Sequence, residues 1–573
     1  MNSSLTIPSK PTRKFLPENL IIDDWSKLES FFDDLKNREI NSKDELDNWL
    51  SDRSELEAVL EEDAGWRYIK MTIDTTDKDL SEVYNFFVTE IHPKTAPYDD
   101  LYNKKLVGSD FINTLTGQAF EIYVRGIRKA IELFREANID LSAKATQEAQ
   151  VYGMTSGAQT IELNGETVTM QQASKELKSV DRNHRKKIFE TMSNRRLEDT
   201  DKFNELFDRL RDLRTEMASN AGFENYRDYK FESMGRFDYT IQDCFDFHDS
   251  IAQEIVPILK GFQQERKDLL GFDLKPYDME VDPSGKAPLK PFETGEELLE
   301  KSIQLFYKLH PYFGECLDTM KEMGHLDLVS KQGKSPGGYN YPLYEIGVPF
   351  IFMNAVGTQR DLITMVHEGG HAVHSFLSRE LKLTSFKSLP SEVAELASMS
   401  MELISMDHWD VFYKDESELK RAKKDQLETL LKILPWVAIV DKYQHWLYTN
   451  PTHTVSERSA AWNEINESLS GGLVDWSDYP ESKANRWHQQ LHIFEVPFYY
   501  IEYGMAQLGA IAVWRNYKKN PELAIQQYMD ALKLGYTKSI PEIYETAGIK
   551  FDFSQEYVKE LADFVRAELE LLK

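Results

Sequence analysis

The sequence predicts a mostly α-helical protein with only a few short strands. Apolar and charged residues repeat at helical spacing over long stretches, most clearly over residues 201–220 and 418–434. Thr294 and Glu297 have the spacing of a capping box ahead of an apolar helical repeat, so we expect a helix to begin there. Strand signals, by contrast, are restricted to short segments.

Two segments have strand character. Residues 160–170 carry alternating apolar residues around Asn164 and Gly165, a dipeptide typical of two-residue hairpin turns. Residues 348–356, VPFIFMNAV, form a short apolar run that predicts a buried strand. If this strand lies at the edge of a sheet, an extended peptide can pair with its backbone. A loop rich in Pro, Gly and Asp over residues 271–293 interrupts the helical pattern.

Composition and charge limit the possible partners. The chain has 573 residues, and we place a soft boundary near residue 190, between an N-terminal helical region (1–190) and a larger region (191–573). The net charge of −28 repels phosphate backbones and anionic lipids, so neither nucleic acid nor membrane is expected as a partner. Two cysteines and the lack of a signal-peptide or membrane-spanning run predict a cytoplasmic protein.

The segment DLITMVHEGGHAVHSFLSRE, residues 361–380, contains the pattern His-Glu-x-x-His. His367 and His371 are four residues apart, so both imidazoles project from one side of a helix within reach of one ion. Glu368 follows the first histidine and faces the open side of the metal, where it can accept a proton from water. The pattern predicts one Zn²⁺ per chain, with Glu368 as the general base of a hydrolytic enzyme.

Two histidines and a water leave tetrahedral zinc one ligand short. A third histidine in the metzincin manner needs Gly at position 374 and His at 377, where this chain has His374 and Leu377. The third ligand is therefore expected on a second helix, within the segment PSEVAELASMSMELISM. Glu395 can bind the metal while Glu402, two turns further on the same face, orients a ligating histidine. Glu392, one turn earlier, remains the competing ligand.

Three further residues of the first helix need an explanation. Gly369 and Gly370 each cost a helix interior about 1 kcal/mol, which indicates that another element approaches closely. His374 lies on the face of the two ligand histidines, one turn further on. It is either an outer hydrogen-bond donor of the metal site or a packed histidine.

From about residue 115 onward the chain resembles the oligoendopeptidase F branch of the thimet-oligopeptidase family of zinc peptidases. The likeness is carried by NGETVTMQQASKELKSVDR, RRLEDTDKFNELFDRL, NAGFENYRDYKFESMGRFDYT, GGYNY, PFIFMNAV, HEGGHAVHS, VAELAS and the Tyr-rich tail. In that family the third ligand is the glutamate of the VAELAS-like segment, which here is Glu395. Relatives usually carry Phe or Ala where this chain has Gly369, and we expect little effect on the metal.

The same family closes its site with a histidine followed by a tyrosine cluster. The matching stretch is HIFEVPFYYIEYGMAQLGA, which begins at His492. The resemblance implies that His492, Tyr500 and Tyr503 stabilise the oxyanion, with Tyr499 as the spare candidate. If the segment is helical, Tyr499 and Tyr503 share a face and Tyr500 lies one step round. The alternative interpretation is a stripe of aromatic core residues.

The resemblance implies a mostly helical, two-lobed zincin-type fold with a small β-sheet near the active site and a deep central channel. It implies a zinc metalloendopeptidase that cleaves internal bonds of short peptide substrates, with residues 191–573 as the catalytic region. A peptide-binding protein without activity is the first alternative, against which the presence of Glu368 argues. A metal-dependent amidase or deacetylase is the second. Cleavage preference, oligomeric state and the use of cobalt or manganese are left open.

Overall fold

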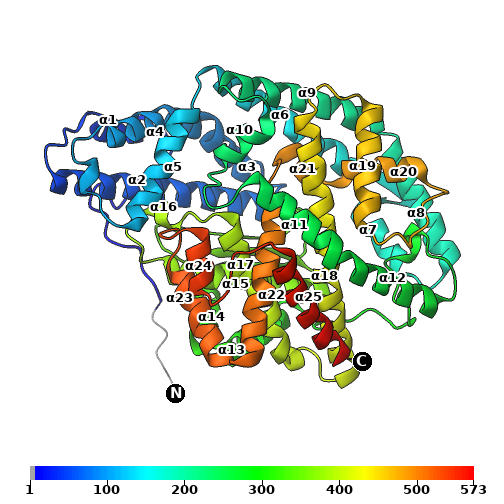
Figure 1. Ribbon diagram of the computed structural model, residues 1–573. Helices are drawn as coiled ribbons and strands as arrows, with labels where there is room; N and C mark the ends of the chain where they lie inside the picture. The colour runs from blue at the N-terminus through cyan, green and yellow to red at the C-terminus, as the bar shows by residue number, and fades with distance from the viewer. Residues whose placement is uncertain (1–6, 573) are drawn as a thin grey trace. The chain divides into compact units, whose positions relative to one another are not determined.

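The computed structural model describes residues 7–572, which form helices and two small sheets (Figure 1). The mostly α-helical fold class predicted from the sequence is confirmed. The chain divides into two compact units, and each combines three separate segments. The first contains the described residues up to Glu132 together with Leu289–Lys423 and Ala506–Phe551; the second contains Leu133–Pro288, Lys424–Met505 and the described residues from Asp552 onward. The sequence boundary near residue 190 stays a prediction.

The first unit contains the N-terminal helices, the three-stranded sheet and the helices around it. Its elements are α1 (Ser26–Asn37), α2 (Lys43–Ile73), α3 (Lys78–Phe86), α4 (His92–Val107), α5 (Gln118–Leu133), α13 (Gly295–Leu309), α14 (Pro311–Met323), β3 (Leu326–Val329), β4 (Tyr339–Tyr341), β5 (Phe350–Ala355), α15 (Gln359–Ser378), α16 (Thr384–Lys387), α17 (Ser391–Ser405), most of α22 (Ile501–Lys519), α23 (Pro521–Lys533) and α24 (Ile540–Thr546).

The second unit is helical apart from one hairpin. Its elements are α6 (Ala137–Gly157), β1 (Thr160–Leu163), β2 (Glu166–Thr169), α7 (Met170–Ser174), α8 (Arg182–Leu197), α9 (Thr200–Asn220), α10 (Tyr226–Ser233), α11 (Ile241–Glu254), α12 (Val256–Leu270), most of α18 (Glu416–Thr449), α19 (Val455–Leu469), α20 (Pro480–Ala484), α21 (Leu491–Glu495) and α25 (Gln555–Glu570).

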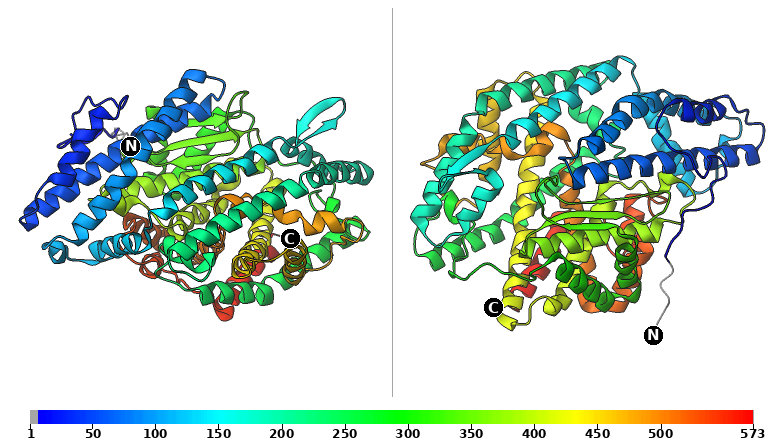
Figure 2. Two further views of the ribbon diagram at one scale, coloured as in Figure 1. Left: turned by 90° about the horizontal axis from the view of Figure 1, so that it is seen from above. Right: turned by 180° about the vertical axis from the view of Figure 1, so that it is seen from behind.

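Local sequence signals account for the ends of several elements. Asn164 (φ 55°) and Gly165 (φ 85°) form the turn between β1 and β2, so the predicted hairpin is confirmed; it stands out in cyan in the left view of Figure 2. Helix α13 begins where predicted, because the Thr294 side chain accepts a hydrogen bond from Glu297 N at 3.1 Å. The Glu297 carboxylate accepts from the backbone N–H of Glu293, one residue before the cap, at 2.7 Å.

The three-stranded sheet has the order β3-β5-β4, with β5 parallel to β3 and antiparallel to β4. Its strands β4 and β5 pack against α15, as the right view of Figure 2 shows in green. The apolar run at residues 348–356 does contain a buried strand, β5, as predicted. The expectation that a peptide can pair with its edge is wrong, because both edges of β5 are already hydrogen-bonded to neighbouring strands.

None of the helices formed by residues 7–572 combines the length and the apolar character that crossing a membrane requires.

Candidate metal centre

Helix α15 presents the two histidines of the His-Glu-x-x-His pattern. A reciprocal capping box starts the helix: Thr358 Oγ1 accepts from Asp361 N, and the Asp361 carboxylate accepts from Thr358 N at 2.8 Å. Its apolar face, with Leu362 among its members, is buried. The His367 and His371 side chains retain 22% and 20% exposure and lie with ring centroids 5.0 Å apart. The helix therefore holds both imidazoles on a face that is still open.

Helix α17 crosses α15 at a point where only glycine fits. A Cβ atom at Gly370 would lie 2.7 Å from Ser398 Cα and 2.8 Å from Ala397 O. This backbone-to-backbone contact confirms the close approach of another element that the sequence predicted, and it brings α17 with Glu395 close to the histidines. At the neighbouring Gly369, the ring of Phe306 from α13 occupies the space that a side chain would need.

Three donor atoms converge between the two helices. Glu395 Oε2 lies 3.3 Å from His367 Nε2 and 3.8 Å from His371 Nε2. The ligand atoms of these three residues all lie within 4.8 Å of one another, whereas Glu392 is not part of the group. Ligands of a tetrahedral zinc ion are separated by roughly 3.3 Å, so the set matches zinc in number, type and spacing.

Glu402 forms a hydrogen bond with His367, the first histidine of the pattern. Its Oε1 lies 2.7 Å from His367 Nδ1 and accepts the proton of that nitrogen. The lone pair of His367 Nε2 then points toward Glu395 and is available to a metal. The hydrogen bond thus selects the imidazole tautomer that a zinc ligand needs. The residues present therefore fit a zinc ion.

Glu368 lies beside the donor atoms in a buried environment. Glu368 is only 7% exposed, and burial raises the pKa of its carboxyl to about 7. The backbone carbonyl of Glu368 accepts a hydrogen bond at 3.2 Å from Asn340 Nδ2 of β4. The sheet thus contacts α15 directly at Glu368, the predicted general base.

His374 is enclosed in the first unit. It is 1% exposed, and burial lowers the pKa of its imidazole to about 3, so the ring is neutral. Among residues 7–572, no described hydrogen bond joins it to His367, His371 or Glu395. A supporting part for His374 at the metal stays a prediction.

The predicted histidine and tyrosines form one aromatic cluster in the second unit. The His492 ring centroid lies 4.7 Å from that of Tyr500, 6.0 Å from Tyr503 and 6.2 Å from Tyr499. All four side chains are partly exposed, in contrast to a fully buried core stripe. The expected helical register is wrong for two of them, because α22 begins at Ile501 and both Tyr499 and Tyr500 precede it.

A hydrogen-bond relay determines which nitrogen of His492 carries a proton. Trp436 Nε1, which can only donate, bonds to Gln490 Oε1 at 3.0 Å. Gln490 Nε2 therefore faces His492 Nδ1, at 2.6 Å, and donates to it. Burial lowers the pKa of His492 to about 4. The imidazole is thus neutral, with its proton on Nε2.

Two buried arginines, which the sequence did not single out, hold the segment before the tyrosines. Arg214 donates to Ile493 O at 3.3 Å and also to Phe494 O. Arg236 donates to Phe498 O and forms an ion pair with Glu502 at 2.8 Å. Arg236 lies in the segment NAGFENYRDYKFESMGRFDYT, which resembles the family, whereas Arg214 lies outside the quoted segments. Nothing in the local pattern of either arginine indicates partners more than 250 residues away.

Comparisons with known proteins identify the family of the chain. A sequence model described as peptidase family M3 matches residues 176–563, and one described as the peptidase M3 N-terminal domain matches residues 15–134. The chain therefore belongs to peptidase family M3. Among solved structures, the fold is similar to PZ peptidase A with an inhibitor (27% identity, 97% of this chain and 99% of that chain, TM-score 0.88). The TM-score is also 0.88 with a solved structure that bears the name oligoendopeptidase F (25% identity, 98% of this chain and 99% of that chain).

The curated relatives are named as oligopeptidases. An oligoendopeptidase F homolog from Lactococcus lactis subsp. lactis is 25% identical over 58% of this chain and 55% of that protein. Oligopeptidase PepF from Bacillus subtilis is 23% identical over 53% and 46%. The chain thus spans about half the length of the curated relatives it matches.

Proposed function

We propose that the chain is a zinc metalloendopeptidase that hydrolyses internal peptide bonds of short oligopeptides. The observation that carries this proposal is the convergence of two histidine nitrogens and one glutamate oxygen, with Glu368 beside them. Membership of peptidase family M3 supports the reaction class, and the names of the relatives support oligopeptides as substrates.

In this proposal His367, His371 and Glu395 hold one zinc ion per chain, and Glu402 keeps His367 in the ligating tautomer. When bound, zinc would polarise the scissile carbonyl and acidify water. Glu368 accepts a proton from the attacking water and transfers it to the leaving amine. Its burial in a site of low polarity supports this part, because a carboxylate there is more basic than one in water.

We further propose that His492, Tyr500 and Tyr503 stabilise the negative charge that develops on the carbonyl oxygen. Burial raises the pKa of Tyr500 to about 12, so its hydroxyl remains a neutral donor at working pH. The Nε2–H of His492, set by Gln490, is a second donor of the right kind. Donors already oriented before the reaction need no reorganisation during it.

The test uses a pool of peptides of mixed length and mass spectrometry of the products. The native chain should cleave peptides internally, lose activity on chelation and recover it when zinc is added. Glu368→Gln should bind one equivalent of zinc at the catalytic site with unchanged affinity, while turnover falls by about 10²–10⁴-fold. Unchanged turnover in that variant would refute Glu368 as the base. Peptide binding without products would favour the inactive-binder alternative, and cleavage of non-peptide amides alone would favour an amidase.

A further inference from the structure

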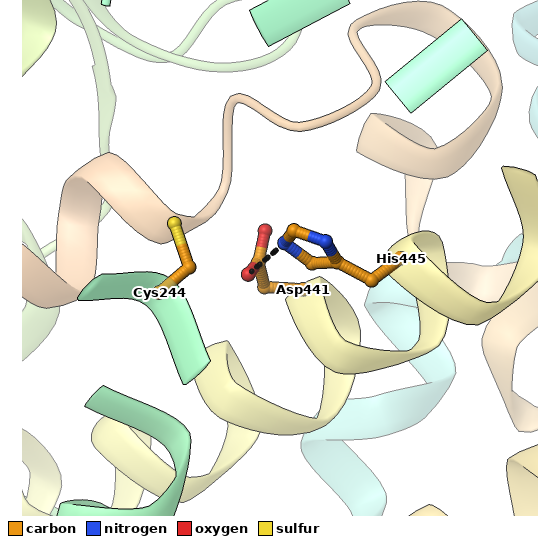
Figure 3. Close-up of side chains that lie close together, drawn as sticks. All are labelled: Cys244, Asp441 and His445. Atoms are coloured by element: carbon orange, nitrogen blue, oxygen red, sulfur yellow. Dashed lines mark ion pairs between the residues drawn. The ribbon is translucent and has the colours of Figure 1, made fainter. Parts of the chain in front are cut away.

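A second group of metal-binding side chains lies within the second unit, apart from the residues discussed so far. Helices α11 and α18 each present two such side chains four residues apart: Cys244 and His248 on α11, Asp441 and His445 on α18. Figure 3 shows the thiol of Cys244 opposite the carboxylate of Asp441 and the ring of His445. One donor atom from each of these three residues lies within 4.8 Å of the other two.

The group is closed off from solvent. Cys244 and Asp441 are each 0% exposed, and His445 is 3% exposed. Among the described residues, neither Asp441 Oδ1 nor His445 Nδ1 has a hydrogen-bond partner. His445 Nε2 lies 3.2 Å from Asp441 Oδ2, but it is not aligned for a hydrogen bond. Each buried polar atom without a partner costs about 1–3 kcal/mol, so an ion that binds these lone pairs would remove the cost.

The fourth residue fixes the carboxylate. His248 Nε2 lies 2.8 Å from Asp441 Oδ2, and the His248 side chain is itself buried. A carboxylate that binds a metal is typically held in this way by an outer hydrogen-bond donor. The arrangement resembles that of the first centre, which is formed by His367, His371 and Glu395. There Glu402 orients His367, and the two centres share no residue.

Charge balance favours a divalent ion at this place. A Cys244 thiolate and the Asp441 carboxylate carry two negative charges, and a neutral His445 adds none. With an ion of charge +2 the group as a whole is uncharged, which reduces the cost of keeping it away from water. On binding, the thiol releases its proton to solvent and a sulfur–metal bond forms, without any transfer of electrons.

We propose that Cys244, Asp441 and His445 supply three ligands of a bound Zn²⁺ ion, with His248 as the outer partner of Asp441. Thiolate, imidazole and carboxylate together are a donor set for zinc, whereas Mg²⁺ and Ca²⁺ select oxygen ligands. The ion would join α11 to α18. It would also support the segment before the tyrosines, because the His445 ring packs 5.3 Å from the ring of Phe498.

Cobalt substitution of the full chain tests this proposal separately from the proposed activity. The donors of the first centre are nitrogen and oxygen only, so a thiolate-to-cobalt charge-transfer band in the near ultraviolet reports a sulfur ligand. We expect two cobalt ions per chain and this band in the native protein. Cys244→Ser should lose the band and one ion, while the matched control Cys316→Ser, at the other buried cysteine, should keep both.

Two further variants keep the test decisive. His367→Ala combined with His371→Ala should retain one cobalt ion and the full band, because only the first centre is removed. If Cys244→Ser does not fold, His445→Asn should lose one ion together with the band. A single cobalt ion without the band in the native protein, or a band that persists in Cys244→Ser, would overturn the proposal. The cluster would then be a buried group in which His248 hydrogen-bonds Asp441 without a metal ion.

Discussion

Replacing Gly370 with alanine tests whether the crossing of α15 and α17 positions Glu395. The new Cβ would lie 2.7 Å from Ser398 Cα, 2.8 Å from Ala397 O and 3.0 Å from Met401 Cβ. Carbon atoms pack comfortably at about 3.5–4.0 Å, so α17 has to move away by roughly 1 Å. Because two of the three contacts are with backbone atoms, no side-chain rotation can relieve them. Overpacking of this kind costs about 1–3 kcal/mol.

The matched control is Gly126→Ala in α5, where a Cβ would meet no atom within 4 Å. Both substitutions gain the same helix propensity, about 1 kcal/mol, so the difference between them isolates the overpacking cost. We expect Gly370→Ala to be less stable than Gly126→Ala by about 1–3 kcal/mol in urea unfolding. Metal ligands tolerate displacements of only about 0.2 Å, so zinc affinity at the first centre should fall on the order of 10-fold or more. Equal stability and equal zinc affinity of the two variants would refute the reasoning.

Three further predictions concern individual side chains. Glu402→Gln should reduce zinc affinity by about 10–100-fold, because the hydrogen bond to His367 is weakened. An unchanged zinc affinity in a competition titration would show that Glu402 does not orient His367 for the metal. Glu395→Gln should reduce zinc affinity by more than that, and Glu392→Gln should leave it unchanged; the opposite order would move the ligand by one turn of α17. Tyr503→Phe or Tyr500→Phe should lower kcat by about 10–10³-fold with zinc content unchanged; if both variants keep native kcat/KM, the aromatic cluster serves packing alone.

Local patterns in the sequence were sufficient for features that depend on residues close together in the chain. The hairpin at Asn164 and Gly165 and the start of α13 at Thr294 follow from turn and capping chemistry within four residues. The placement of His367 and His371 on one face follows from the helical period alone. None of these features requires knowledge of which helices pack together.

Predictions that depended on neighbours distant in sequence were less reliable. The strand at residues 348–356 was correctly expected, yet its place between β3 and β4 was not, because an apolar run does not reveal how many strands flank it. The helical register predicted for Tyr499 and Tyr500 also failed. The chain bends ahead of α22 at Phe498, whose φ is 68°, and its carbonyl is held by Arg236.

The sequence by itself determined the helical class, the two histidines four residues apart and the glutamate between them, because helical geometry links residues within one turn. Residue spacing left two glutamates of α17 as candidate ligands, and the family resemblance favoured Glu395. The tertiary structure adds the neighbours of these glutamates: α17 approaches α15 at Gly370, and Glu395 Oε2 lies 3.3 Å from His367 Nε2. The pairing of Cys244 with Asp441 and His445 likewise arose only from packing, because α11 and α18 lie far apart in the chain and meet only when the second unit folds.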